Sequence, residues 1–362
     1  MRKFCIFCGE KPVNKNKEHV IPQWLIKYTG DPKRIAFIGK KDDKDIKYPW
    51  LSFVFPACEE CNSNFGKIEV KIKSILEKLD NENLVTHNEM NLFLDWLDKI
   101  RIGMWLGHAM LKKKDFEPNF FINNRVGSKD RLCLIYKLND SEKGIGIIGT
   151  DTPVFENTPS CFTLILNNMV FLNYSKEFLL SKNLGFPYPK NYSYSSYNQL
   201  NVDKILPGRY EVKFPILDGK IIKPAIKIYQ SIINATHDLK RPFAGTGRSF
   251  YNSNCFLFNK KLIQSRIYLG DEQNDFHGFW LQKKRFNFKF NEKLERDLFV
   301  HAIIKTTLEH QNHSLEESLS KYEQIEKEEK LIFDKYYGEI LEFNNVKIKE
   351  INDLLKGFYR II

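Results

Sequence analysis

Two Cys-x-x-Cys pairs near the start of the chain constrain its fold more than any other feature of the sequence. Cys5 forms the first pair with Cys8, and Cys58 forms the second with Cys61. A Cys-x-x-Cys turn is short enough to direct both thiolates at one ion, and four thiolates suit the tetrahedral zinc of structural sites. Neither pair lies in the βαβ setting of a thioredoxin-like redox motif. The spacing therefore predicts one structural Zn²⁺ that holds together a loop-rich N-terminal unit.

Composition excludes several classes of protein. The chain has 42% hydrophobic and 14% aromatic residues, which is more than a disordered chain carries. It contains no run of about 18 apolar residues, so no membrane-spanning helix is predicted. Its first residues also lack the apolar segment of a secretory signal. We therefore expect a cytoplasmic protein without a membrane partner, in which the remaining cysteines (Cys133, Cys161 and Cys255) are buried apolar side chains.

The net charge of the chain is +11, from 56 Lys and Arg residues against 45 Asp and Glu residues. An excess of this size favours a polyanionic partner, because each neutralised phosphate releases a condensed counterion. A general bias of composition toward Lys would give the same excess without a functional cause. Charge therefore makes nucleic acid a candidate partner but does not decide the function.

The pattern of apolar residues divides the chain into three parts. These are residues 1–79, a basic and loop-rich module that ends in a helix; residues 80–115, a helical connector; and residues 116–362, an α+β domain of unknown role. An apolar helix over about 88–113 dominates the connector. Alternating apolar residues over 116–300 favour an antiparallel sheet, and 291–343 returns to an amphipathic helical pattern. The predicted fold class is α+β, with the metal-bound module at the front.

Between the two cysteine pairs, Glu18 and His19 precede the apolar sequence Val-Ile-Pro. A carboxylate suits a hard cation such as Mg²⁺, and an imidazole can accept a proton near neutral pH. Adjacent residues of a regular strand point to opposite sides, so the two side chains need not share a role. Asn62 directly follows Cys61 at the start of a predicted helix, where its amide oxygen can bind the same cation. The alternative for His19 is a buried core histidine or a further metal ligand.

Residues 5–66 resemble the HNH endonucleases of the ββα-metal class, in the subgroup where two Cys-x-x-Cys pairs hold a zinc ion beneath the active site. The sequence from Glu18 to Pro22 resembles the first half of the family motif, and Cys58-Glu-Glu-Cys61-Asn62-Ser-Asn-Phe-Gly resembles the second. The resemblance covers about a fifth of the chain. The family usually has an Asn before the second pair that orients the histidine. This sequence has none there, so Ser52 or a backbone carbonyl would replace it.

The resemblance implies a zinc-stabilised ββα-metal fold and a metal-dependent phosphodiester hydrolase. His19 would be the general base that activates water, and Glu18 and Asn62 would bind one divalent cation, Mg²⁺ or Mn²⁺. The implied substrate is nucleic acid, with DNA favoured over RNA, and the large second domain suggests an effector of restriction or phage defence. The alternative is a catalytically inactive, zinc-stabilised protein that binds nucleic acid or serves as a scaffold.

The rest of the chain offers candidates for recognition. The basic residues expected to contact phosphates are Lys15, Lys17, Lys33, Arg34, Lys67, Lys71 and Lys73. Glu69 follows Asn62 by two helical turns, which is too far along an unbroken helix to bind the same ion, so we expect it to be exposed or to support the site indirectly. The C-terminal region is the candidate surface for a substrate, a ligand, a partner protein or a second copy of the chain.

Overall fold

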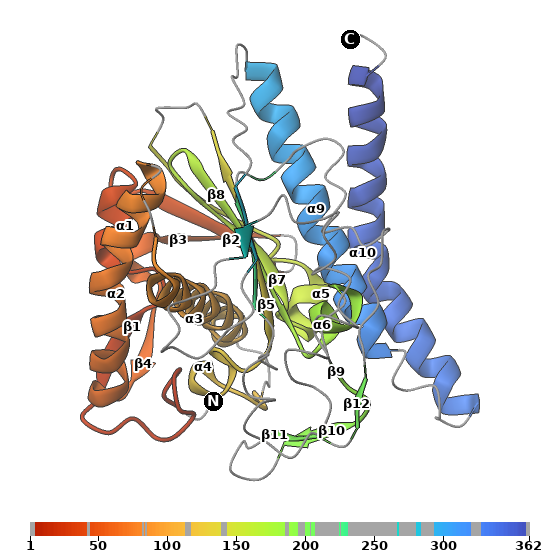
Figure 1. The fold of residues 1–362 in the computed structure, drawn as a ribbon, viewed down its shortest axis with the longest axis horizontal. Coiled ribbons are helices and arrows are strands. Elements are labelled where there is room, and N and C mark those ends of the chain that lie inside the picture. Colours follow the sequence, from red (N-terminus) through yellow and green to blue (C-terminus); the bar gives the residue numbers. More distant parts are fainter. Residues whose placement is uncertain are drawn as a thin grey trace.

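A seven-stranded sheet lies between two long helices at the centre of the molecule (Figure 1). This architecture comes from a computed structural model of the chain. The structure describes residues 4–41, 44–81, 83, 85–112, 117–138, 143–184, 188–194, 200–202, 204–206, 224, 226–230, 266–267, 280–283, 293–319 and 327–359. Helix α3 (His87–Leu111) covers one face of the sheet and helix α9 (Lys293–Leu319) covers the other. The prediction of a mixed α and β fold with a C-terminal helical segment is confirmed.

The strands of the central sheet pair only with antiparallel neighbours among the described residues, as the apolar alternation predicts. In spatial order they are β14 (Arg266–Ile267), β15 (Trp280–Lys283), β13 (Ile226–Gln230), β5 (Asp130–Lys137), β8 (Met169–Lys176), β7 (Cys161–Leu166) and β6 (Ile145–Ile148). A two-residue turn joins β7 to β8, since Leu166 pairs with Met169. Asn167 has a φ of 53° in this turn, a conformation that Asn tolerates better than most residues.

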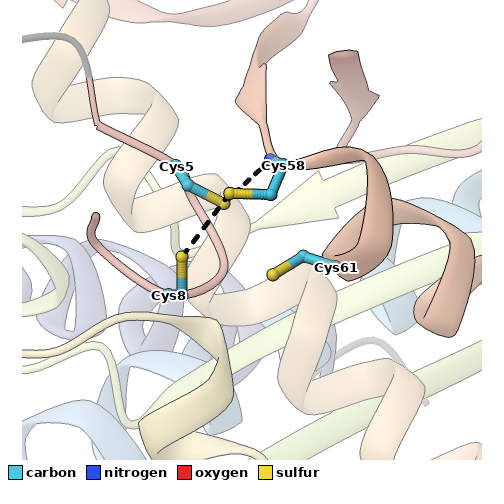
Figure 2. Close-up of side chains that lie close together, drawn as sticks. All are labelled: Cys5, Cys8, Cys58 and Cys61. Carbon is cyan, nitrogen blue, oxygen red and sulfur yellow. Dashed lines mark hydrogen bonds between the residues drawn. The ribbon is translucent and has the colours of Figure 1, made fainter. Parts of the chain in front are cut away.

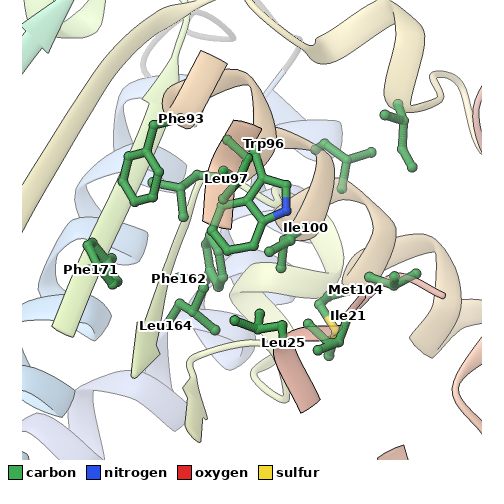
Figure 3. Close-up of a cluster of buried hydrophobic side chains, with 14 of the residues drawn as sticks. Ile21, Leu25, Phe93, Trp96, Leu97, Ile100, Met104, Phe162, Leu164 and Phe171 are labelled. Carbon is green, nitrogen blue, oxygen red and sulfur yellow. The ribbon is translucent and has the colours of Figure 1, made fainter. Parts of the chain in front are cut away.

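Side chains on the two faces of the sheet pack against different helices. Phe162, Leu164 and Phe171 face α3, where Figure 3 shows them beside the apolar residues of that helix. On the opposite face, the hydroxyl of Thr163 lies 2.7 Å from the hydroxyl of Thr307 on α9. The ring of Tyr174 meets that of His310 edge-on, at 5.5 Å between centroids. The period-2 alternation of the strands therefore produces a sheet that is covered on both sides.

Helix α3 begins with a capping box, in which Thr86 and Glu89 bond each other's backbone N–H groups. Its apolar residues belong to one continuous core that also contains Ile21 and Leu25 of the N-terminal module and the inner face of the sheet (Figure 3). The segment expected to be a helical connector thus packs between the N-terminal elements and the central sheet. Its aromatic residues Trp96 and Trp105 are buried.

The N-terminal part is built on an antiparallel pair of strands and a long helix. Its elements are β1 (Asn16–His19), α1 (Gln23–Tyr28), β2 (Ile35–Lys41), β3 (Lys44–Pro49), a 3-10 turn (Trp50–Ser52), β4 (Val54–Ala57) and α2 (Glu59–Asp80). Strand β1 pairs with β4, and β2 pairs with β3 as a separate hairpin inserted between them. We refer to residues 4–80 as the four-cysteine module. Helix α2 packs along α3, so the module rests on the central core.

The C-terminal helices complete the far side of the sheet. Helix α10 (Lys327–Tyr359) packs on α9 and on α5 (Pro153–Asn157), and lies at the outer edge of the molecule (Figure 1). The smaller elements are α4 (Ile122–Arg125), α6 (Leu179–Leu184) and the strand pairs β9 (Tyr188–Pro189) with β12 (Ile205–Leu206) and β10 (Tyr192–Tyr194) with β11 (Leu200–Val202). Within the described residues, no helix has both the length and the apolar character needed to cross a membrane.

Candidate functional site

The four cysteines of the two Cys-x-x-Cys pairs converge on one point (Figure 2). Their sulfur atoms all lie within 4.8 Å of one another, and the sulfurs of Cys8 and Cys58 are 3.9 Å apart. Tetrahedral zinc with bonds of about 2.3 Å needs sulfurs about 3.8 Å apart, whereas a disulfide needs about 2 Å. The cluster therefore has the ligand set and the spacing of a structural zinc site, as the sequence predicts.

Local backbone structure explains why these four side chains meet. Cys5 and Cys8 lie on a tight turn that Gly9 closes with a φ of 83°, and a Cβ atom on Gly9 would come within 2.2 Å of the Phe121 ring. Glycine is therefore required there on both conformational and steric grounds. Cys58 directly precedes α2, and Cys61 lies in its first turn. The start of this helix thus brings the second pair to the first.

Backbone N–H groups point at the sulfurs of the cluster. The Cys58 N–H donates to the Cys5 sulfur at 3.2 Å, and the Val13 N–H donates to the Cys58 sulfur at 3.4 Å. Burial alone would raise the pKa of the Cys5 thiol, but hydrogen bonds from the backbone of Cys8 and Cys58 outweigh it, so the pKa lies below its ordinary value. Burial and the adjacent Cys5 raise the pKa of Cys8 to about 12. A bound cation would supply the charge that lets all four sulfurs ionise.

His19 ends strand β1 with its ring half-buried. Its Nε2 atom lies 3.0 Å from the side-chain nitrogen of Gln23, and the ring also hydrogen-bonds to the backbone of Leu51. Burial lowers the pKa of His19 and the nearby Lys99 lowers it further, which outweighs the opposite effect of Leu51. A lowered pKa favours the neutral form of the imidazole. Leu51 is one residue before Ser52, which the sequence analysis names, with a backbone carbonyl, as the replacement for the orienting Asn.

Glu18 points to the other side of β1, into the space between the module and α3. The residue is only 5% exposed, and its carboxylate forms an ion pair with the ammonium group of Lys99, which is fully buried on α3. Lys99 also pairs with Glu69 of α2 at 2.7 Å. Burial raises the pKa of Glu18 despite Lys99, while both carboxylates hold the pKa of Lys99 above its ordinary value against the effect of burial.

The Lys99 ammonium group also fixes the backbone beside the candidate base. It donates to the carbonyl oxygens of His19 and Val20, at 3.3 and 3.2 Å. Sequence reasoning missed this residue because it lies 80 positions from His19. A signal was present, since Asp98, Lys99 and Arg101 interrupt the apolar stretch from Trp96 to Leu106, and all three side chains are buried. Charged residues are rarely buried unless they are paired.

Asn62 connects the start of α2 to β1. Its side-chain nitrogen donates to the carbonyl oxygen of Lys17 at 3.3 Å, next to Glu18 in the chain. The structure thus brings Asn62 to the same strand as Glu18 and His19, while the Glu18 carboxylate is engaged by Lys99. Glu69, expected to be exposed or to support the site indirectly, forms an ion pair with the same Lys99.

The basic residues considered for phosphate contacts fall into two groups. The lysines among them, Lys15, Lys17, Lys33, Lys67, Lys71 and Lys73, are exposed on the four-cysteine module. Arg34 instead donates to the carbonyl oxygens of Thr29 and Ile26 at the end of α1, at 2.7 and 3.3 Å. Its guanidinium group satisfies free carbonyls of that helix, so the hypothesis of a phosphate contact is less suited to Arg34 than to the lysines.

Comparison of the chain with family models, with curated proteins and with solved structures gave no match.

Proposed function

We propose that the four-cysteine module is a zinc-stabilised nuclease of the HNH type, which hydrolyses phosphodiester bonds of nucleic acid. One observation carries the proposal: the cysteine cluster holds the first turn of α2 against the β1–β4 pair, so that Asn62 bonds to β1 two residues from His19. This strand–strand–helix corner has the order of elements that the resemblance implies. The net charge of +11 and the exposed lysines of the module suit a polyanionic substrate.

In this proposal His19 takes the proton from the attacking water molecule. A base must be unprotonated before the reaction, and the lowered pKa of His19 meets that condition near neutral pH. Gln23 and Leu51 hold the ring, and Lys99 holds the backbone on which the ring is mounted. These contacts restrict the orientation of the imidazole. Because the Gln23 amide nitrogen can only donate, Nε2 accepts from it, and an attacking water molecule would have to take the place of this amide.

The two metal ions implied by the resemblance fit the residues differently. Four converging thiolates fit zinc, which would supply the folding energy of the module. The proposed second ion, Mg²⁺ or Mn²⁺, would require Glu18 and Asn62 as oxygen ligands. Glu18 does not fit that role in this arrangement, since it is buried and paired with Lys99. We therefore assign no chemical step to a Glu18-bound cation, and propose instead that Glu18 positions the strand through Lys99.

Plasmid cleavage tests the proposed function. Replacing His19 by Ala is expected to reduce the rate of cutting by about 10²-fold or more, because loss of a positioned base typically costs 10²–10⁴ in rate. His301→Ala is a matched control, since this histidine lies on α9 with its Nδ1 atom bonded to the backbone of Asp297. Supercoiled DNA and a structured RNA are incubated with each protein, with Mg²⁺, Mn²⁺ or EDTA. Equal cutting by wild type and His19→Ala, or none by wild type in any condition, contradicts the proposal.

The dependence of the cutting rate on pH gives a second prediction. Because burial lowers the pKa of His19, we expect the rate to rise with pH below the ordinary value of 6.5 and to be level at neutral pH. Protonation removes the base as the pH falls through the lowered pKa. The measurement is the initial rate between about pH 5 and pH 8 at constant ionic strength. A rate that is highest at the acid end of this range would contradict the role of His19 as a base.

A catalytically inactive protein that binds nucleic acid is the second candidate. It is favoured by the ion pair that Glu18 forms with Lys99, because this carboxylate is not free to bind a catalytic cation. This alternative predicts salt-dependent binding of DNA, equal in wild type and His19→Ala, with no cutting by either protein.

A further inference from the structure

Exposed apolar residues are concentrated on α10. Ten large hydrophobic side chains of the described residues are exposed, and six of them lie on this helix. The most exposed of these six are Leu331 and Ile332, at 74% and 73%; they are about 100° apart around the helix, and only Ile332 lies on the line of residues described next. The helix already buries a different side, with Ile340, Asn344 and Ile351, against the body of the molecule. A second apolar side on one outer helix indicates a contact surface rather than a scattering of single residues.

Three of these residues are evenly spaced along the helix. Ile332, Phe343 and Leu354 are separated by 11 residues each, close to three full turns, so they drift only about 20° around the helix at each step. We define the α10 stripe as the exposed residues on this line: Ile332, Tyr336, Glu339, Phe343, Lys347, Glu350 and Leu354. The stripe is about 33 Å long at 1.5 Å per residue. It lies beside the buried side of the helix, and at one end Tyr336 also lines a pocket with Trp105 and Phe155.

The stripe is complementary to itself when it is reversed. Counted outward from Phe343 in either direction along the chain, the stripe residues are 4, 3 and 4 positions apart. If two copies meet antiparallel about a twofold axis at Phe343, each stripe residue therefore lies opposite a stripe residue of the other copy. Ile332 would then face Leu354, Tyr336 would face Glu350, and Glu339 would face Lys347. These are apolar, hydroxyl–carboxylate and opposite-charge pairs. A parallel pairing would instead place Glu339 and Glu350 against their own copies.

From this arrangement we infer that two copies of this chain associate through α10, antiparallel, with Phe343 at the twofold axis. Self-complementary surfaces of this kind give closed twofold dimers, the commonest symmetric assembly. Lys347 also forms an ion pair with Glu350 of its own helix at 2.9 Å, but both side chains are more than half exposed, and such pairs contribute little. The inference stands independently of the proposed nuclease activity. A dimer would carry two four-cysteine modules.

Measuring molar mass across a range of protein concentration tests the inference. We expect wild type to reach twice the mass of one chain by about 50 µM, and Phe343→Glu to remain at the mass of one chain, because two like charges would meet at the axis. Leu331→Glu is the matched control. It introduces the same charge on the same helix, about 120° around from Phe343, and it should dimerise as wild type does. A monomeric wild type, or a Phe343→Glu variant that still dimerises, overturns the inference.

A charge exchange tests the antiparallel register. Glu339→Lys alone and Lys347→Glu alone each place like charges opposite each other, so each is expected to raise the dissociation constant several-fold. The double variant restores opposite charges and should return to within about twofold of wild type. Circular dichroism and thermal unfolding confirm that every variant is folded. Additive effects in the double variant would contradict the proposed pairing.

Discussion

Replacing Cys61 by Ser is expected to remove zinc from the chain and to unfold the four-cysteine module. Without an ion, the contacts that remain between the Cys5–Cys8 turn and α2 include the stacking of Phe7 on Phe65, at 4.7 Å between ring centroids, while four unpaired thiols would be left together at the start of the helix. Zinc binding to such a site is coupled to folding and contributes on the order of 10 kcal/mol in small zinc domains. We therefore expect an early unfolding transition or loss of folded protein, measured by thermal unfolding and by protease sensitivity of residues 4–80.

Cys61→His is the control for this prediction, because histidine is an ordinary zinc ligand and three cysteines with one histidine form a common structural site. This variant should retain zinc and most of the stability of wild type. Cys61 is only half-buried, so neither substitution creates a large cavity. A Cys61→Ser protein with the melting temperature of wild type would show that the cluster does not hold a structural ion.

Replacing Lys99 by Met is expected to lower the free energy of unfolding by about 3–5 kcal/mol, since removing one partner of a buried ion pair leaves an uncompensated charge. Here two carboxylates, those of Glu18 and Glu69, lose the same counter-charge. Met has a similar length and keeps the packing of the side chain. The measurement is urea unfolding at neutral pH.

The triple variant Lys99→Met, Glu18→Gln and Glu69→Gln separates charge from packing. It contains no buried charge at this point, so we expect it to recover much of the stability that Lys99→Met loses. The loss in Lys99→Met should also grow as the pH rises above the ordinary carboxyl pKa of 4.5. Burial raises the pKa of the Glu18 carboxyl, so the folded protein accommodates its protonated form better than its ionised form. The free energy of unfolding therefore falls as the pH rises and this carboxyl ionises. An equal loss at pH 5 and pH 8, with no recovery in the triple variant, would contradict this account of Lys99.

Short-range chemistry explains what could be predicted from the sequence. The Cys-x-x-Cys spacing determines where two sulfurs point, so the two pairs were enough to predict a four-sulfur site. Strands β5, β7 and β8 are apolar runs separated by turn residues such as Asn167, and their antiparallel pairing was predictable for that reason. The adjacency of Glu18 and His19 likewise indicated that the two side chains lie on opposite sides of a strand.

Long-range packing explains what could not be predicted. Lys99 reaches Glu18 from a helix 81 residues further along the chain, and nothing in the local pattern pairs the two. The composition of the sequence does not indicate which residues of the module, the connector and the second domain contact one another, and residues of all three ranges belong to one hydrophobic core around α3. Arg34 has the charge expected of a phosphate contact, but its guanidinium group donates a hydrogen bond to a backbone carbonyl at the end of α1. Each of these outcomes depends on tertiary contacts that a single sequence does not reveal.

Native mass spectrometry of the purified chain tests the central claim most directly, which is that Cys5, Cys8, Cys58 and Cys61 together hold a structural metal ion. The account predicts about one zinc ion per chain in wild type and in Cys61→His, and none in Cys61→Ser. Two results together would contradict it. Wild-type protein prepared with zinc present would carry no metal, and the thiols of these four cysteines would react with an alkylating reagent while the protein is folded.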